Sequence, residues 1–205
     1  MRYADADRTG ALFPQDRAIL SDEEVERILA ARLVLPDSAR VAVPDVSAGS
    51  SRGYQYHSPT ERQLPEQQVR DVEAALLQGD RVDSVVFLTS LLAPSPLSIP
   101  TVREAGLRTQ ADVVLVVRTE VNLYRDFRFF RGDRYHAYST VEVVLIDIRT
   151  GLAPFTHIVT RDLVTSKQEE DPSAVETRQR AIASATSPSM EAIGAALVAY
   201  LNAAK

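Results

Sequence analysis

DVVLVVRTEVNLY at residues 112–124 and VEVVLIDIRTG at residues 141–151 are the two stretches that decide the fold of this chain. The first begins with a continuous apolar run at 113–117, which indicates a central strand that is buried on both faces. The second ends in Arg-Thr-Gly at 149–151, where glycine supplies the positive φ of a tight turn. The two stretches therefore predict neighbouring antiparallel strands. With the segment that follows they form a meander, whose strands are expected at 112–124, 134–148 and 152–165.

Upstream of this meander, helices alternate with strands. Ser21 and Glu24 have the spacing of a capping box at a helix start. We expect that first helix to end before Pro36. The elements that follow are expected in this order: a strand at 40–46, a helix at 65–79, a strand at 81–88 and a helix at 100–110. Pro44 indicates either the end of its strand or an edge of the sheet, because proline cannot donate to a strand ladder.

Downstream of the meander, helix-start residues occur twice. Asp171 and Pro172 form the first pair and Ser187 and Pro188 the second, so the chain ends in two consecutive helices or in one kinked helix. Crossover helices followed by a meander are typical of an α/β (α+β) fold. We expect a single mixed sheet of about five strands that ends in a long antiparallel meander and is covered by helices.

Composition narrows the classes of function. Hydrophobic residues make up 45% and charged residues 25% of the chain, which is typical of a soluble folded protein. The net charge of -5 argues against general binding of polyanions. The absence of cysteine excludes disulfides, zinc fingers, iron–sulfur clusters and thiol catalysis. No apolar run approaches the ~18 residues that cross a bilayer.

The order of the elements resembles the periplasmic α/β domain of the CsgG-like curli-secretion lipoproteins and the amino-terminal domain of TolB. The matching segments are RVAVPDV at 40–46, VVFL at 85–88, ADVVLVVRTEVN at 111–122 and VVLIDIRTG at 143–151. The resemblance covers roughly residues 38–204. It implies an envelope lipoprotein or periplasmic assembly component that has no shared catalytic residues and no cofactor.

The start of the chain leaves two interpretations of its location. Residues 1–20 lack periodicity and are expected to form a flexible tether, and residues 21–205 a single domain. The tether resembles the segment that follows the lipidated cysteine of a bacterial lipoprotein. No secretory signal follows Met1. The protein is therefore either a periplasmic outer-membrane lipoprotein, held at the membrane only by a lipid anchor on a removed leader, or a cytoplasmic protein.

The hairpin of the meander is unusually rich in aromatic and arginine side chains. These types are the most enriched at protein–protein hot spots, so we expect this arm to bind a protein partner or a second copy of the chain. The candidate contact residues are Tyr124, Arg125, Phe127, Arg128, Phe129, Phe130, Arg131, Tyr135 and Tyr138. In the alternative interpretation, the aromatic side chains fold back on their own domain. Single-stranded nucleic acid could stack on the same rings, but the net charge disfavours it.

The leading hypothesis is a non-enzymatic envelope protein that acts through protein contacts, without a catalytic, metal or cofactor site. The competing hypothesis is a small-ligand or nucleotide-binding enzyme that uses the loop SAGSSRG at 47–53, because α/β proteins often hold phosphate after a strand. That loop lacks both the dinucleotide-binding and the P-loop glycine patterns.

Other titratable side chains give little support for chemistry. The three histidines, His57, His136 and His157, are isolated in sequence, although the last two lie on strands that are expected to be neighbours. The aspartates near strand ends, Asp45, Asp112 and Asp147, are expected to satisfy turns rather than to act as acids or bases. Ser139 lacks the G-x-S-x-G pattern of a nucleophile.

Overall fold

The computed structural model describes residues 21–44, 70–94, 96–126, 134–166 and 173–203. The expected tether at 1–20, the loop at 47–53, the hairpin tip at 127–133 and the helix start at 171–172 lie outside the described residues.

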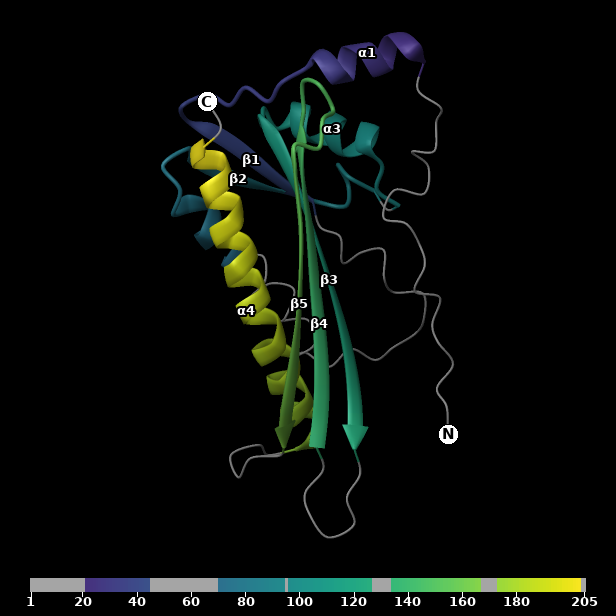
Figure 1. Ribbon diagram of the computed structural model, residues 1–205, viewed down its shortest axis with the longest axis vertical. Helices are drawn as coiled ribbons and strands as arrows, with labels where there is room; N and C mark the ends of the chain where they lie inside the picture. The colour runs from purple at the N-terminus through teal and green to yellow at the C-terminus, as the bar shows by residue number, and fades with distance from the viewer. Residues whose placement is uncertain (1–20, 45–69, 95, 127–133, 167–172, 204–205) are drawn as a thin grey trace.

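Five strands form one mixed sheet with the order β2-β1-β3-β4-β5 (Figure 1). The strand β1 (Ala39–Pro44) is parallel to β2 (Val82–Leu88) and to β3 (Val113–Asp126). The strands β4 (Arg134–Asp147) and β5 (Phe155–Ser166) continue from β3 as an antiparallel meander. The α/β fold with a single mixed sheet and a terminal meander, as predicted from the sequence, is confirmed.

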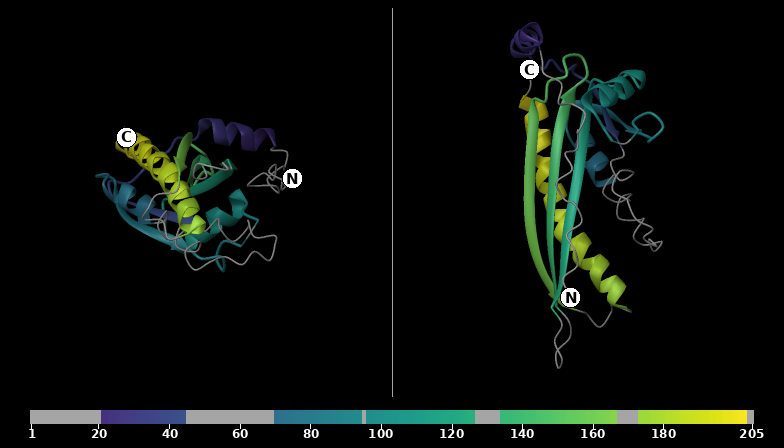
Figure 2. Two further views of the ribbon diagram at one scale, coloured as in Figure 1. Left: turned by 90° about the horizontal axis from the view of Figure 1, so that it is seen from below. Right: turned by 90° about the vertical axis from the view of Figure 1, so that its right-hand side faces the viewer.

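Helices cover both faces of this sheet. The helix α4 (Ala174–Ala203) runs along one face of the meander, and α3 (Ile99–Arg108) lies on the opposite face (Figures 1 and 2). Residues 70–77 are also helical, and α1 (Asp22–Ala30) precedes β1. The domain is therefore a three-layer arrangement with the sheet in the middle.

The core consists of two apolar layers, one on each side of the sheet. On the α4 side, the buried residues include Val41, Val113, Leu115, Val143, Leu145, Ile193, Leu197 and Leu201. On the α3 side, they include Ala42, Val102, Ala105, Val114, Val116 and Ile146. Consecutive residues of β3 therefore enter opposite layers, which is why the run at 113–117 is apolar throughout.

Strand lengths differ across the sheet. The strands β3 and β4 each have 14 residues, whereas β1 has 6 and β2 has 7. β1 is in register only with Val113 and Val114 of β3. The meander therefore projects beyond the parallel part of the sheet (Figure 1). We call its projecting part, residues 118–126, 134–142 and 158–166, the distal meander.

Two local features are decided by the structure. Pro44 is the last residue of β1, which lies between β2 and β3, so proline marks a strand end and not an edge of the sheet. Leu107 of α3 is apolar and yet 66% exposed. The helix α3 turns Val102, Ala105 and Gly106 toward the sheet, and each further residue rotates by about 100°, so Leu107 points away.

The C-terminal segment is one continuous helix of 30 residues that contains Pro188. Of the two interpretations left open by the sequence, two separate helices are therefore excluded. At its start, the Ser173 hydroxyl accepts a hydrogen bond from the Glu176 backbone N–H at 3.4 Å. This Ser-x-x-Glu pattern supplies a capping interaction at the N-terminus of α4.

Candidate functional site

The two faces of the distal meander have different surroundings. Successive side chains of a strand point to opposite faces, so odd-numbered residues here face α4 and even-numbered residues face away from it. On the α4 side, the N-terminal half of the helix buries Tyr135, Ala137, Ala181 and Ala185. The Ser139 hydroxyl also lies in this layer and donates to Thr186 Oγ1 at 3.3 Å.

Tyr135, which was predicted as a contact residue, therefore lies on the buried face and not on the contact surface. Its side chain is 5% exposed and packs in the cluster beneath α4. The sequence predicted it as a partner-binding residue because tyrosines accumulate in the hairpin. Tyr135 and Tyr138 are three positions apart, however, so the two rings emerge on opposite faces of β4.

The opposite face of the distal meander, which we call the open face, carries exposed apolar side chains. Tyr124 is 54%, Tyr138 is 43%, Ile158 is 64% and Val164 is 49% exposed. No helix of the described chain packs on these residues. Figure 2 (right) shows the three strands with α4 behind them. The open face is therefore a sheet surface on which large apolar side chains meet solvent.

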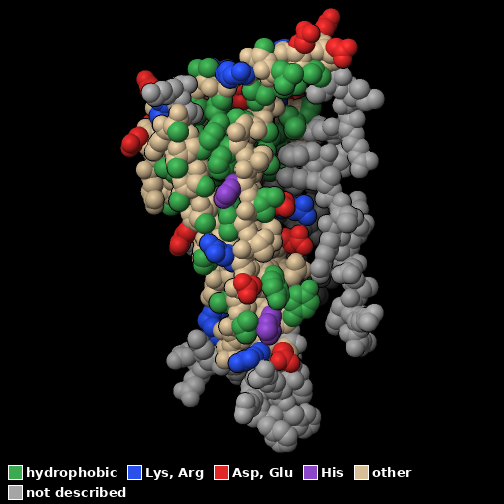
Figure 3. All heavy atoms as spheres, viewed as in Figure 1, with side chains coloured by type: hydrophobic (Ala, Val, Ile, Leu, Met, Phe, Trp, Pro, Cys, Tyr) green, Lys and Arg blue, Asp and Glu red, His purple; other side chains and the backbone are tan. Residues whose placement is uncertain are grey.

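The centre of the open face is a shallow hollow between β3 and β4. It has a volume of about 450 Å³ and is lined by Asn122, Tyr124, His136 and Tyr138. Figure 3 shows hydrophobic, histidine, acidic and basic side chains side by side where the meander ends. Aromatic rings with polar neighbours are typical of a surface that binds protein rather than of an enclosed catalytic pocket.

The remaining residues of the predicted contact set are placed only in part. Arg125 belongs to β3, in register with Tyr135. The hairpin-tip members Phe127, Arg128, Phe129, Phe130 and Arg131 lie outside the described residues. Of the nine predicted residues, the structure thus brings Tyr124 and Tyr138 together on the open face. Sequence reasoning missed Ile158 and Val164, each of which is next to another apolar residue of β5, Val159 or Leu163.

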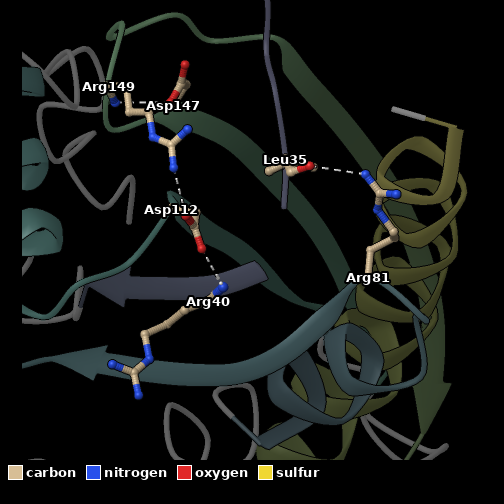
Figure 4. A network of polar contacts seen from close by, with 6 residues as sticks. All are labelled: Leu35, Arg40, Arg81, Asp112, Asp147 and Arg149. Carbon is tan, nitrogen blue, oxygen red and sulfur yellow. Dashed lines mark hydrogen bonds and ion pairs between the residues drawn. The ribbon is translucent and has the colours of Figure 1, made fainter. Parts of the chain in front are cut away.

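The strand-end aspartates hold backbone and turn groups, as expected. Asp112 Oδ2 accepts the Arg40 backbone N–H at 2.9 Å, and Asp112 Oδ1 lies 3.5 Å from Arg149 (Figure 4). Asp147 is 4% exposed and accepts the Arg149 backbone N–H at 3.0 Å and the Thr150 hydroxyl at 2.5 Å. These carboxylates join β1, β3 and the β4–β5 turn. The third aspartate, Asp45, lies outside the described residues.

The two described histidines do not form a pair. His136 is in register with Val164 at the distal end, whereas His157 is in register with Val143. Their even and odd numbers place them on opposite faces of the sheet. Within the described ranges, no group of three or more His, Asp or Glu side chains lies close enough to hold a metal ion. His57 and the loop at 47–53 lie outside those ranges.

Comparison with known proteins identifies similar structures but no family. No family model matches the chain, and no curated protein matches its sequence. The PelC dodecamer from Paraburkholderia phytofirmans is 18% identical, over 76% of this chain and 90% of that chain, with a TM-score of 0.40. The minor lipoprotein of Acinetobacter baumannii is 10% identical, over 84% and 94%, with a TM-score of 0.39.

A third similar structure is the uncharacterized lipoprotein B of Nitrosomonas europaea. It is 12% identical, over 82% of this chain and 84% of that chain, with a TM-score of 0.35. Bacterial lipoproteins are thus among the structures to which this chain is similar. The more specific resemblance to CsgG-like lipoproteins and TolB stays a prediction. Among the helices of the described segments, none is both long and apolar enough to cross a bilayer.

Proposed function

We propose that this protein is a non-enzymatic component of the bacterial envelope that acts through protein–protein contacts on the open face of the distal meander. The observation that carries the proposal is the asymmetry of the two faces. One face is buried under α4, while the other exposes Tyr124, Tyr138, Ile158 and Val164.

Apolar exposure of this kind has a free-energy cost that a partner would remove. Burial of apolar surface contributes about 25 cal/mol per Å². Contiguous exposed apolar patches with polar borders are typical of protein interaction sites. On the open face the border is formed by Arg118, Glu142, Asp126 and Arg134, which are half-buried or exposed. Exposed apolar side chains interspersed with charged ones, including Asp162 beside Tyr138, have the mixed composition of a protein interface.

The hydrogen bonds of the buried and half-buried polar side chains favour the protein-contact hypothesis over the enzyme hypothesis. Asp112 and Asp147 hold backbone N–H groups, and Ser139 is buried against Thr186. Each of these groups already has a structural partner. The competing enzyme hypothesis depends on the loop at 47–53. Thermal-shift measurements with nucleotides distinguish the two, because a ligand that binds only the folded state raises the melting temperature.

The proposed location is the periplasmic side of the outer membrane, with a lipid anchor that precedes Met1. This part of the proposal rests on the resemblance of the element order to envelope lipoproteins. The coding sequence upstream of Met1 tests it directly. A leader that ends in a lipidation cysteine supports the envelope location, whereas an upstream stop codon supports the cytoplasmic alternative.

Site-specific photocrosslinking in the native host tests the contact surface. A benzoylphenylalanine at position 138 samples the open face, and the same group at the exposed position 107 on α3 serves as the matched control. We expect a protein adduct from position 138 and none from position 107. If position 138 gives no adduct, or if both positions give the same adducts, the proposed contact surface is wrong.

A further inference from the structure

Four charged side chains mark the corners of the β3–β4 part of the open face. At its proximal end, Arg118 of β3 is in register with Glu142 of β4, and at its distal end Asp126 of β3 is in register with Arg134 of β4. The charge order along β3 is therefore positive to negative. Because β4 is antiparallel to β3, its charges run from negative at the proximal end to positive at the distal end.

The centre of this arrangement is the row Asn122–Tyr138. Asn122 lies midway between Arg118 and Asp126 along β3, and Tyr138 lies midway between Arg134 and Glu142 along β4. A rotation by 180° about an axis that crosses the strands at this row exchanges the two ends of the face. The same rotation exchanges each positive corner with a negative corner.

The face is consequently complementary to itself. When two copies stack with their open faces together on that axis, Arg118 meets Asp126 of the other copy and Glu142 meets Arg134 of the other copy. A two-fold axis that runs along β4 through Tyr138 instead places Glu142 on Glu142 and Arg134 on Arg134. For a dimer centred on Tyr138, the charge pattern therefore favours the axis that crosses the strands. Charge complementarity of this kind sets partner choice and register more than raw affinity.

We propose that the occupant of the open face is a second copy of this chain, in a symmetric dimer centred on Tyr138; this proposal rests on the proposed function. A two-fold interface uses the same patch on both subunits, so the patch must be self-complementary. At the centre, Tyr138 contacts Tyr138 of the other copy. The exposed ring of Tyr124 and the side chain of Val164 lie in the adjacent row, and Ile158 lies in the outer row of Arg118 and Glu142.

One residue of the face opposes the pairing. Asp162 of β5 is in register with Tyr138, so it lies on the axis row and faces Asp162 of the other copy. Like charges directly opposite each other are destabilising. The dimer therefore makes a specific prediction: Asp162→Asn removes the repulsion and lowers the dimer dissociation constant. Glu120 stays within its own copy, where it lies 3.9 Å from Arg118.

Complementary charge variants test the dimer by sedimentation velocity. In the acidic variant, Arg118→Glu/Arg134→Glu, all four corners are negative. In the basic variant, Asp126→Arg/Glu142→Arg, all four corners are positive. We expect each variant alone to raise the dimer dissociation constant at least about tenfold, whereas an equimolar mixture restores a one-to-one dimer. Recovery in the mixture also shows that both variants are folded.

Matched controls carry the same charge changes away from the open face. Arg108→Glu/Arg178→Glu changes exposed residues of α3 and α4, and Asp83→Arg/Glu191→Arg changes exposed residues of β2 and α4. Both controls should dimerise like the unmodified chain. A chain that stays monomeric up to about 1 mM, or acidic and basic variants that dimerise like the controls, overturns the dimer.

The photocrosslink from position 138 separates this proposal from the proposed function. An adduct with twice the mass of the chain supports the dimer. An adduct only with a different protein overturns self-pairing but leaves the protein-contact function in place. The absence of any adduct overturns the proposed function itself.

Discussion

The ring of Tyr138 meets the ring of Tyr124 edge to face, with ring centroids 6.0 Å apart and ring planes at 79°. The two residues are diagonal neighbours, since Tyr124 is in register with His136 and Tyr138 with Asn122. Such aromatic pairs stabilise by about 0.5–1.5 kcal/mol beyond the area that they bury. The contact holds two exposed rings in fixed positions before any partner arrives, which lowers the entropy cost of binding.

Tyr135 and Tyr138 should respond differently to the same substitution. Tyr135→Ala removes a buried ring beneath α4, and we expect the free energy of unfolding to fall by about 3 kcal/mol. Tyr138→Ala removes an exposed ring and its contact with Tyr124, and should cost about 0.5–1.5 kcal/mol. Urea denaturation measures both. Equal losses would contradict the placement of the two rings on opposite faces.

Asp112 should be more important for its acceptor oxygen than for its charge. Asp112→Ala leaves the Arg40 backbone N–H without its 2.9 Å partner, so we expect a loss of about 1–3 kcal/mol in the free energy of unfolding. Asp112→Asn keeps an oxygen acceptor and loses the Arg149 ion pair, which is worth about 1 kcal/mol or less at the surface. Chemical denaturation should therefore give a lower free energy of unfolding for Asp112→Ala than for Asp112→Asn. The reverse order would contradict this role of the acceptor oxygen.

Gly106 permits a close approach of α3 to the sheet. A Cβ atom at this position would lie 2.6 Å from Ile148 Cδ1 and 2.9 Å from Val114 Cγ2. We expect Gly106→Ala to lower the free energy of unfolding by about 1–3 kcal/mol through overpacking. Ile148→Val removes the nearest atom, so the alanine should cost less in that background. A double-mutant cycle measures the coupling, and additive losses would argue against the steric explanation.

Pro188 should reduce the stability of α4. Its ring side chain removes a backbone donor from the interior of the helix, and it is exposed, so substitution sacrifices little packing. Pro188→Ala should raise the free energy of unfolding by up to about 3 kcal/mol. Ser187→Ala, a change at the exposed neighbour, should stay within about 0.5 kcal/mol. Thermal unfolding of both variants checks this, and a destabilised Pro188→Ala protein would contradict it.

Tyr200 should make stability depend on alkaline pH. Burial raises the pKa of its hydroxyl above the ordinary 10.0, and its ring packs 5.0 Å from that of Phe155. Below pH 10, Tyr200 is neutral in both the folded and the unfolded protein, so its full contribution to the free energy of unfolding is present. As the pH rises through 10, the unfolded chain ionises first, so stability falls until the raised pKa is passed. Urea unfolding at about pH 9 to 11 should show a shallower decline for Tyr200→Phe. Identical declines would contradict the raised pKa.

Much of the fold follows from local sequence patterns. The apolar run at 113–117 predicted a strand with two buried faces, as β3 has. The turn at 149–151 predicted that the next strand pairs antiparallel with the one before it, as β4 and β5 do. Capping and periodicity depend on neighbours in the chain, so they can be recognised without coordinates. The continuity of α4 could not be predicted in this way. Tertiary packing of Ala181 and Ala185 before Pro188, and of Ile193 and Leu197 after it, keeps both halves helical.

The location of the candidate site could be predicted from the types of residue in the hairpin. The face of the sheet to which each of these side chains points could not. The excess of tyrosine and arginine pointed to the hairpin, and Tyr124 and Tyr138 do lie together on the open face. Composition gave Tyr135 the same weight, although it is buried. Ile158 and Val164 belong to β5, and they join the open face only because β5 is in register with β4.

The sequence by itself determined the identity and order of the strands and helices, because alternation and helical periodicity are properties of short segments. It also determined which side chains of each strand share a face. Only the tertiary structure decided which face α4 covers and which face stays open. That choice depends on contacts between segments far apart in the chain, where α4 buries its apolar side against one surface of the meander and leaves the other to solvent.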